Sequence, residues 1–102
     1  MARIELAVEV LHDFDRFVDH MTTFGVEHVE RRIDELIEAI QVLAHSPEMG
    51  RLARGNKREL VIGSGSRGYV ALYRYVELID TVFVLAVRAQ RERGYKHRRR
   101  GR

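Results

Sequence analysis

The fold is decided between residues 46 and 95, where three apolar runs follow a proline. The stretch reads SPEMGRL at residues 46–52, KRELVIG at 57–63, GYVALYRY at 68–75 and TVFVLAVRAQRERGY at 81–95. The runs at 58–62, 69–75 and 82–87 are rich in β-branched and aromatic residues, as strands are. Residues 50–55 before them are expected to form a basic loop. Because the links are short and a parallel pair needs a long crossover, these consecutive strands are predicted to pair antiparallel.

The first half of the chain is predicted to be helical after a short strand. Residues 3–7 alternate between charged and apolar side chains, which is the period of a half-buried strand. Between residues 10 and 21, and again between 26 and 43, apolar residues recur every three or four positions. The charged residues of the first helix, Asp13 among them, are assigned to its wet face. Gly25 separates the two helices and Pro47 ends the second, so an antiparallel helix hairpin is expected.

The element order is therefore β-α-α-β-β-β, which predicts an α+β fold with a helix hairpin packed on a small, mainly antiparallel sheet. A length of 102 residues suits one domain, which we assign to residues 1–95, followed by a basic tail at 96–102 that we expect to be flexible. There are no cysteines and no apolar run near the ~20 residues that span a bilayer. We expect a soluble, cytoplasmic protein with no membrane association.

Charge is distributed unevenly along the chain. Residues 1–47 contain ten acidic and four basic residues, whereas residues 88–102 contain eight basic residues and a single acid, Glu92. A positive end of this kind indicates an anionic partner near the C-terminus. For the last five residues, a solvated tail without a partner is an equal alternative.

Motifs for a cofactor, a metal or a nucleophile are weak or missing. GSGSRG at residues 63–68 matches G-x-G-x-x-G, but a strand follows it where a dinucleotide site needs a helix, so a hairpin loop is predicted. The five histidines form no His-x₃-His pair, and the chain has no cysteine to complete a ligand set. No serine or threonine has an evident catalytic partner. No metal and no cofactor is expected.

Basic and aromatic residues alternate in the second half of the chain. Arginines at 58, 67, 74, 88, 91 and 93 and Lys96 are interleaved with tyrosines at 69, 73, 75 and 95. Arginine and aromatic side chains together can hold phosphates and stack on bases. Tyrosines in strands are more often packing residues, and alternation places Tyr73 and Tyr75 on one face and Arg74 on the other.

At this point the residues resemble a known family. The element order is similar to that of the RelE/ParE toxin superfamily of bacterial type II toxin–antitoxin systems, and most similar to its ParE-like, plasmid-stabilisation branch. The resemblance is carried by SPEMGR at residues 46–51, REL at 58–60, GYVALY at 68–73, and VLAVR followed by GY between 84 and 95. It covers nearly the whole chain, and its specificity lies in the order and spacing of the motifs.

The resemblance implies a toxin that a co-expressed antitoxin neutralises, with one of two targets. RelE-like members cut messenger RNA on the ribosome with a basic cluster and a C-terminal tyrosine or comparable group. ParE-like members poison DNA gyrase without assigned cleavage chemistry. An arginine follows the tyrosine of the glycine-tyrosine strand in the nucleases, where this chain has Val70. Their lysine pair in the preceding strand is also not reproduced, since Glu59 and Leu60 follow Arg58.

These departures favour a gyrase-inhibiting toxin that is not an enzyme. Its target-binding residues are predicted to be Arg58, Arg67, Arg88, Arg91, Arg93, Tyr95 and Lys96. The alternative is a ribosome-dependent mRNA endoribonuclease, for which the candidate catalytic residues are Arg58, Arg88, Arg91 and Tyr95. A third possibility is an inactive module retained for complex formation. In each case the antitoxin is expected to cover the helix hairpin and sheet as an amphipathic helix or added strand. Its anchors are predicted to be exposed apolar residues of the first helix, namely Leu11, Phe14, Phe17, Val18 and Met21.

Overall fold

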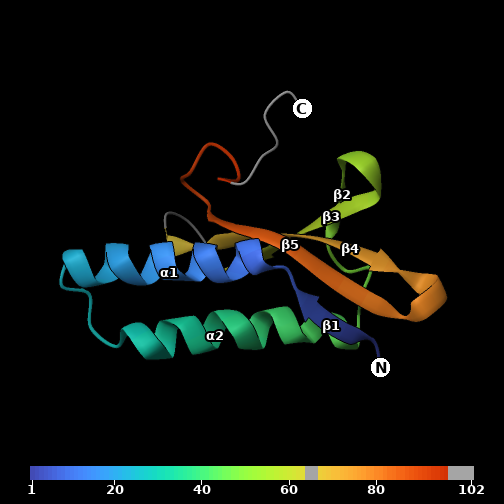
Figure 1. The fold of residues 1–102 in the computed structure, drawn as a ribbon, viewed down its shortest axis with the longest axis horizontal. Helices are drawn as coiled ribbons and strands as arrows, with labels where there is room; N and C mark the ends of the chain where they lie inside the picture. Colours follow the sequence, from blue (N-terminus) through green and yellow to red (C-terminus); the bar gives the residue numbers. More distant parts are fainter. Residues whose placement is uncertain (64–66, 97–102) are drawn as a thin grey trace.

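The computed structural model describes residues 1–63 and 67–96 as two helices and a five-stranded sheet (Figure 1). The elements in chain order are β1 (Arg3–Leu6), α1 (Val8–Thr23), α2 (Val29–Gln41), β2 (Arg51–Ala53), β3 (Lys57–Ile62), β4 (Tyr69–Val76) and β5 (Thr81–Ala89). The predicted order is confirmed, with one strand more than expected. Strand β2 lies in the stretch expected to be a loop, and it forms by pairing with β3.

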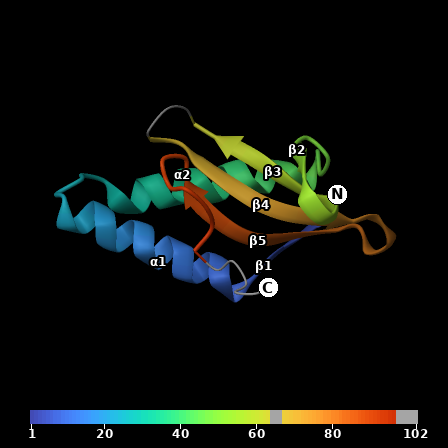
Figure 2. The ribbon, with the colours of Figure 1, turned by 90° about the horizontal axis from the view of Figure 1, so that it is seen from above.

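The sheet has the order β1-β5-β4-β3-β2 (Figure 2). The pairs β3–β4 and β4–β5 are antiparallel, as predicted from their short links. The unpredicted strand β2 also pairs antiparallel with β3, whereas β1 runs parallel to β5. The chain between β1 and β5 contains both helices and three strands, so it is long enough for the crossover that a parallel pair needs. Strand β5 is therefore held by β1 on one side and by β4 on the other.

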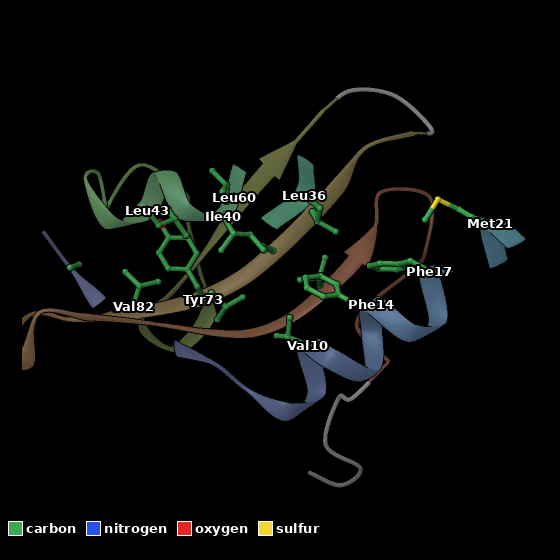
Figure 3. Packing of buried hydrophobic residues seen from close by; sticks show 14 residues of the cluster. Val10, Phe14, Phe17, Met21, Leu36, Ile40, Leu43, Leu60, Tyr73 and Val82 are labelled. Atoms are coloured by element: carbon green, nitrogen blue, oxygen red, sulfur yellow. The ribbon is translucent and has the colours of Figure 1, made fainter. Parts of the chain in front are cut away.

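Both helices cover one face of the sheet, and residues 90–96 after β5 turn toward the other face (Figure 1). Figure 3 shows Val10, Phe14 and Phe17 of α1 pointing into the space between the helices and the strands. Leu36 and Ile40 of α2 meet them in the same cluster. Since an amphipathic helix buries its apolar stripe against the core, this packing follows from the sequence pattern.

Three of the residues expected as exposed antitoxin anchors are in this core. Phe14, Phe17 and Met21 are 8%, 6% and 5% exposed. The prediction that they form an open apolar surface is wrong, because α1 has one apolar stripe and its own sheet occupies that stripe. Leu11 is 49% exposed and Val18 is half-buried, so these two remain accessible on the helix.

Asp13 is a second departure from the expected helix faces. Its side chain is completely buried, so the prediction that it lies on the wet face is wrong. One carboxylate oxygen, Oδ2, accepts a hydrogen bond of 2.9 Å from the backbone N–H of Val87 in β5. The other oxygen, Oδ1, lies 2.6 Å from Nη1 of Arg16 one turn along the helix. Both partners offset the cost of burying a carboxylate.

Tyr73 fixes the loop that follows the helices. The side chain of Tyr73 is fully buried, and its hydroxyl accepts a hydrogen bond of 2.9 Å from the N–H of Gly50. A Cβ atom at position 50 would lie 2.8 Å from the carbonyl oxygen of Glu59, so the backbone approaches β3 closely there. Tyr75 packs against the core and Arg74 is exposed, which confirms the predicted alternation along β4.

Some sequence predictions fall outside the described residues. Positions 64–66 of the glycine-rich loop and positions 97–102 of the basic tail belong to this group, so only Lys96 of that tail is placed. Within the described ranges, no helix has the length and apolar character to cross a bilayer.

Candidate functional site

The C-terminal basic segment, residues 88–96, begins at the end of β5 and has a defined path. Nη1 of Arg88 donates to three backbone carbonyl oxygens, those of Ala89 at 3.3 Å, Gln90 at 3.2 Å and Glu92 at 3.1 Å. The N–H of Glu92 in turn donates to the carbonyl of Ala89 at 3.0 Å. One arginine side chain therefore gathers the carbonyl groups of a tight turn, which orders the backbone that carries the other cations.

Glu92 connects this turn to helix α1. Its Oε1 atom accepts a hydrogen bond of 2.8 Å from the N–H of Ala89 and lies 3.0 Å from Nη2 of Arg16. Burial opposes the charge of Glu92, but these two contacts outweigh it and hold the pKa of Glu92 below its ordinary value. Burial also opposes the charge of Arg16, yet its hydrogen bonds to Asp13 and Glu92 raise the pKa of Arg16. Both groups are therefore charged at neutral pH.

Tyr95 lies against β3 on the face of the sheet away from the helices. Glu59 lies between Arg58 and Leu60, and Leu60 is in the core, so alternation turns Glu59 to the outer face. The hydroxyl of Tyr95 donates to Oε2 of Glu59 at 2.6 Å, and the guanidinium of Arg88 lies 5.3 Å from the centre of the Tyr95 ring. The segment therefore packs over the outer face as far as β3.

The pKa shifts of Tyr95 and Glu59 keep the tyrosine as the hydrogen-bond donor and the carboxylate as the acceptor. Burial and the hydrogen bond to Glu59 both raise the pKa of Tyr95 far above its ordinary value. Burial opposes the charge of Glu59, but the hydrogen bonds from Tyr95 and Arg51 lower its pKa on balance. Arg51 donates from Nε to Oε1 of Glu59 at 3.1 Å. At neutral pH the tyrosine keeps its proton and the carboxylate keeps its charge.

The structure does not gather all the predicted target-binding residues. Arg58 points to the helix side, where its Nη1 donates to the carbonyls of Glu48 at 3.0 Å and Gly50 at 2.8 Å. Arg67 is exposed beside the N-terminal end of α2, where it lines a hollow of about 530 Å³. These two arginines lie apart from the C-terminal basic segment.

The remaining predicted residues all lie on the C-terminal basic segment. Arg88 and Tyr95 stack, as described, and Arg91 lies close to α1, with Nη2 2.8 Å from Nε2 of His20. Arg93 and Lys96 are exposed on the same segment. The predicted set therefore divides into a coherent C-terminal group and two separate arginines.

Val70 belongs to the outer face of the sheet, next to the C-terminal basic segment. It is directly opposite Arg88 in the β4–β5 ladder and is only 2% exposed. Since opposed residues of an antiparallel pair point to the same face, an apolar side chain lies beside Arg88 under the segment. This is the position at which RelE-like nucleases are expected to have an arginine.

Three acidic residues of this network, Asp13, Glu59 and Glu92, were missed by the sequence reading. Asp13 is three positions after Val10 and one before Phe14, so it borders the apolar stripe, which is the one local sign of its burial. Glu92 is the single acid among residues 88–102. Glu59 carries no local signal, because its partner Tyr95 is 36 residues away.

The surface offers two kinds of chemistry. Arg91, Arg93 and Lys96 present positive charge to an anionic partner. The hydroxyl of Tyr95 donates a hydrogen bond to the carboxylate of Glu59, and the guanidinium of Arg88 lies over the Tyr95 ring. Among residues 1–63 and 67–96, no group of three or more potential metal ligands is present.

Comparisons with known proteins agree with this fold. A family model described as "ParE toxin of type II toxin-antitoxin system, parDE" matches residues 4–94. Toxin RelE3 of Caulobacter vibrioides is 28% identical over 93 residues, which make up 91% of this chain and 99% of that protein.

Two solved structures share the architecture. The first is titled "Chromosomal ParDE TA system from P. aeruginosa" and matches with a TM-score of 0.72 at 17% identity, covering 87% of this chain and 96% of that one. The second is titled "Crystal structure of the intact E. coli RelBE toxin-antitoxin complex" and matches with a TM-score of 0.57 at 19% identity, covering 91% and 100%. At these identities the likeness supports the predicted α+β fold.

Proposed function

The chain belongs to the ParE toxin family of type II toxin–antitoxin systems, and from this premise we propose that it inhibits DNA gyrase and is neutralised by a cognate antitoxin. The membership confirms the RelE/ParE resemblance inferred from the residues. The choice of gyrase over the ribosome is the proposal, and it depends on the geometry of the C-terminal basic segment.

The observation that carries this choice is the separation of the four candidate nuclease residues. Arg58 points to the helix side of the sheet and is engaged by two backbone carbonyls. Arg88 and Tyr95 lie on the outer side, and Arg91 is held at α1 by His20. Acid–base cleavage needs its groups within hydrogen-bond reach of one reacting site. The division of these side chains supports binding in preference to cleavage.

The state of Tyr95 supports the same choice. A tyrosine that removes a proton from a ribose hydroxyl must first lose its own, and the raised pKa of Tyr95 opposes that loss. Val70, opposite Arg88, contributes no charge that could bind a phosphate. Arg91, Arg93 and Lys96 remain as exposed cations for docking on an acidic surface of gyrase.

A supercoiling assay tests the proposal. Purified chain is added to gyrase and relaxed plasmid, and supercoiling is expected to fall as its concentration rises. Arg93→Ala should weaken inhibition by roughly two- to fivefold, the usual effect of one exposed charge pair. Arg54→Ala removes the same charge from the exposed turn before β3 and serves as the matched control. Undiminished supercoiling at a large excess of chain would refute the proposal.

A ribosome-dependent endoribonuclease is the second candidate, because one cluster favours it. Arg88, Tyr95 and Glu59 bring a cation, a proton donor and a charged carboxylate together on the outer face. The carboxylate could accept the proton that Tyr95 cannot. Primer extension on messenger RNA from a translation extract separates the candidates, since codon-positioned cuts in the presence of the chain would favour the nuclease.

We further propose that the antitoxin contacts the accessible side of α1. Leu11 is 49% exposed, and Leu6 and Val8 beside it are 39% and 57% exposed. With Val18 further along the helix, they give an amphipathic partner an apolar strip. Leu11→Asp should weaken co-purification with the antitoxin, whereas Glu38→Ala on α2 should not. Equal recovery of both variants would place the antitoxin elsewhere.

A further inference from the structure

Strand β5 has an edge that β1 covers only in part. The ladder between β1 and β5 runs from Arg3 opposite Thr81 to Leu6 opposite Val84. Beyond it, the N–H of Ala7 still reaches the carbonyl of Val84 at 2.9 Å. The later residues of β5 extend past β1, so their backbone groups on this edge need other partners.

Two carboxylates supply those partners. Oδ2 of Asp13 accepts the N–H of Val87 at 2.9 Å, and Oε1 of Glu92 accepts the N–H of Ala89 at 2.8 Å. Alternate N–H groups of a strand point to the same edge. The N–H groups of Val87 and Ala89 are therefore on the edge that pairs with β1, beyond the end of β1. Asp13 comes from α1 and Glu92 from the C-terminal basic segment. Carboxylates from α1 and from the C-terminal basic segment thus accept the N–H groups at the edge of β5 that β1 does not cover.

Arg16 joins the two carboxylates. Its Nη1 lies 2.6 Å from Oδ1 of Asp13 and its Nη2 lies 3.0 Å from Oε1 of Glu92. The guanidinium also lies 4.9 Å from the ring centre of Phe17, which restricts its movement. Its side chain is 30% exposed, so water screens the pair only in part. A planar guanidinium can serve two acceptors at fixed angles, whereas a lysine ammonium is a point charge.

Asp13, Arg16 and Glu92 form a chain of contacts, and the full burial of Asp13 fixes one end of that chain. The core holds Asp13, Asp13 orients Arg16, and Arg16 restrains Glu92, which caps the turn of the segment. We propose that Arg16 is a positioning residue that orders the C-terminal basic segment, so that its exposed cations are presented to the target as one surface. The inference deepens the proposed function and rests on it for the target.

The expected consequence is a loss of order confined to the segment. Without Arg16, Glu92 keeps the N–H of Ala89 but loses its tie to α1, so residues 89–96 sample more conformations. A partner must then order them on binding, which weakens binding without removing any contacting group. Arg16 itself needs no contact with the target.

The test uses the full chain and two independent measurements. Arg16→Met keeps an aliphatic side chain over Phe17 and removes the guanidinium. Arg16→Lys restores the positive charge without the two guanidinium nitrogens that contact both carboxylates. Hydrogen exchange of the free protein is expected to speed up at residues 89–96 in Arg16→Met and to be partly restored in Arg16→Lys, with β4 unchanged. Gyrase inhibition is expected to weaken about fivefold, as for loss of one part-buried ion pair. Arg31→Met, an exposed arginine of α2, is the matched control.

The two measurements separate this inference from the function it rests on. If wild-type chain leaves gyrase active, the proposed function fails, while the exchange experiment still tests the positioning. Exchange at residues 89–96 that matches the wild type would overturn the inference. Exchange that rises equally in β4 would also overturn it, because Arg16 would then support the fold as a whole. A double variant of Arg16→Met and Glu92→Gln should weaken inhibition no further than the first alone.

Discussion

Replacing Asp13 should destabilise the fold more than any surface charge of α1. In Asp13→Ala, the buried N–H of Val87 loses its acceptor, which costs about 1–3 kcal/mol. The lost pair with Arg16 adds at most about 1 kcal/mol, since the Arg16 side chain is 30% exposed and partly screened. The sum is about 1–4 kcal/mol. That is a large fraction of the 5–15 kcal/mol typical of a domain.

Asp13→Asn separates the two contributions. Its amide retains a carbonyl oxygen for the N–H of Val87 in nearly the same volume, so only the charge is lost, and the cost should be about 1 kcal/mol. Asp15→Ala, an exposed acid of the same helix, should remain within about 0.5 kcal/mol of wild type.

Urea unfolding followed by circular dichroism measures these differences as shifts in midpoint at constant slope. In thermal unfolding, each kcal/mol corresponds to about 4–8 °C for a domain of this size. The reasoning is refuted if Asp13→Ala unfolds within about 0.5 kcal/mol of wild type. It is also refuted if the asparagine and alanine variants are equally unstable, because the retained acceptor would then be irrelevant.

Three further predictions concern other polar contacts. Tyr73→Phe leaves the buried N–H of Gly50 without its acceptor and should cost about 1–3 kcal/mol in urea unfolding, so an unchanged midpoint would contradict the contact. The pKa of Glu92 lies below its ordinary 4.5. The stability that charged Glu92 contributes is therefore complete above pH 4.5 and is lost as the pH falls through the lowered value, so Glu92→Gln should make stability depend less on pH in that acidic range. The hydrogen bond to Asp80 raises the pKa of Tyr75 to about 12, and Asp80→Asn should return the titration of that tyrosine toward 10 in ultraviolet absorbance. A titration that does not move would show that Asp80 is not the cause.

The helices and long strands could be predicted because their signals are local. Apolar residues at helical spacing and β-branched runs are properties of the chain itself, and short links leave an antiparallel arrangement as the only choice. Strand β2 could not be predicted in the same way. Its sequence, RLA, has too few residues for a period, and it becomes a strand only because β3 is beside it.

The candidate site could be predicted only where its signals are local in the sequence. The clustering of basic residues near the C-terminus is visible in the sequence, and Arg88, Arg91, Arg93, Tyr95 and Lys96 do lie on one segment. Which face each side chain takes depends on long-range packing. Alternation along β3 predicts that Arg58 and Glu59 point to opposite faces of the sheet. Nothing local in the sequence indicates that Tyr95 lies on the same face as Glu59.

The misplaced antitoxin anchors and the missed aspartate have one cause. The sequence pattern predicts that the apolar residues of α1 face a partner and that the acid at the border of the same stripe faces water. A helix of a small α+β domain must first satisfy its own sheet. Phe14 and Phe17 do so by apolar burial, and Asp13 does so by accepting a hydrogen bond.

The shortness of β1 gives a physical reason for an acid at that point of the core. Because β1 pairs with β5 only as far as Val84, the N–H of Val87 lies beyond that ladder and points to Asp13 of α1. An apolar residue at position 13 would leave that donor unsatisfied in the interior, at a cost comparable to the stability that its burial adds. A carboxylate removes the cost but brings a charge, and Arg16 balances it. Arg16 then has a second nitrogen free to hold Glu92, so the closure of the sheet edge and the ordering of the basic segment arise from the same two side chains of α1.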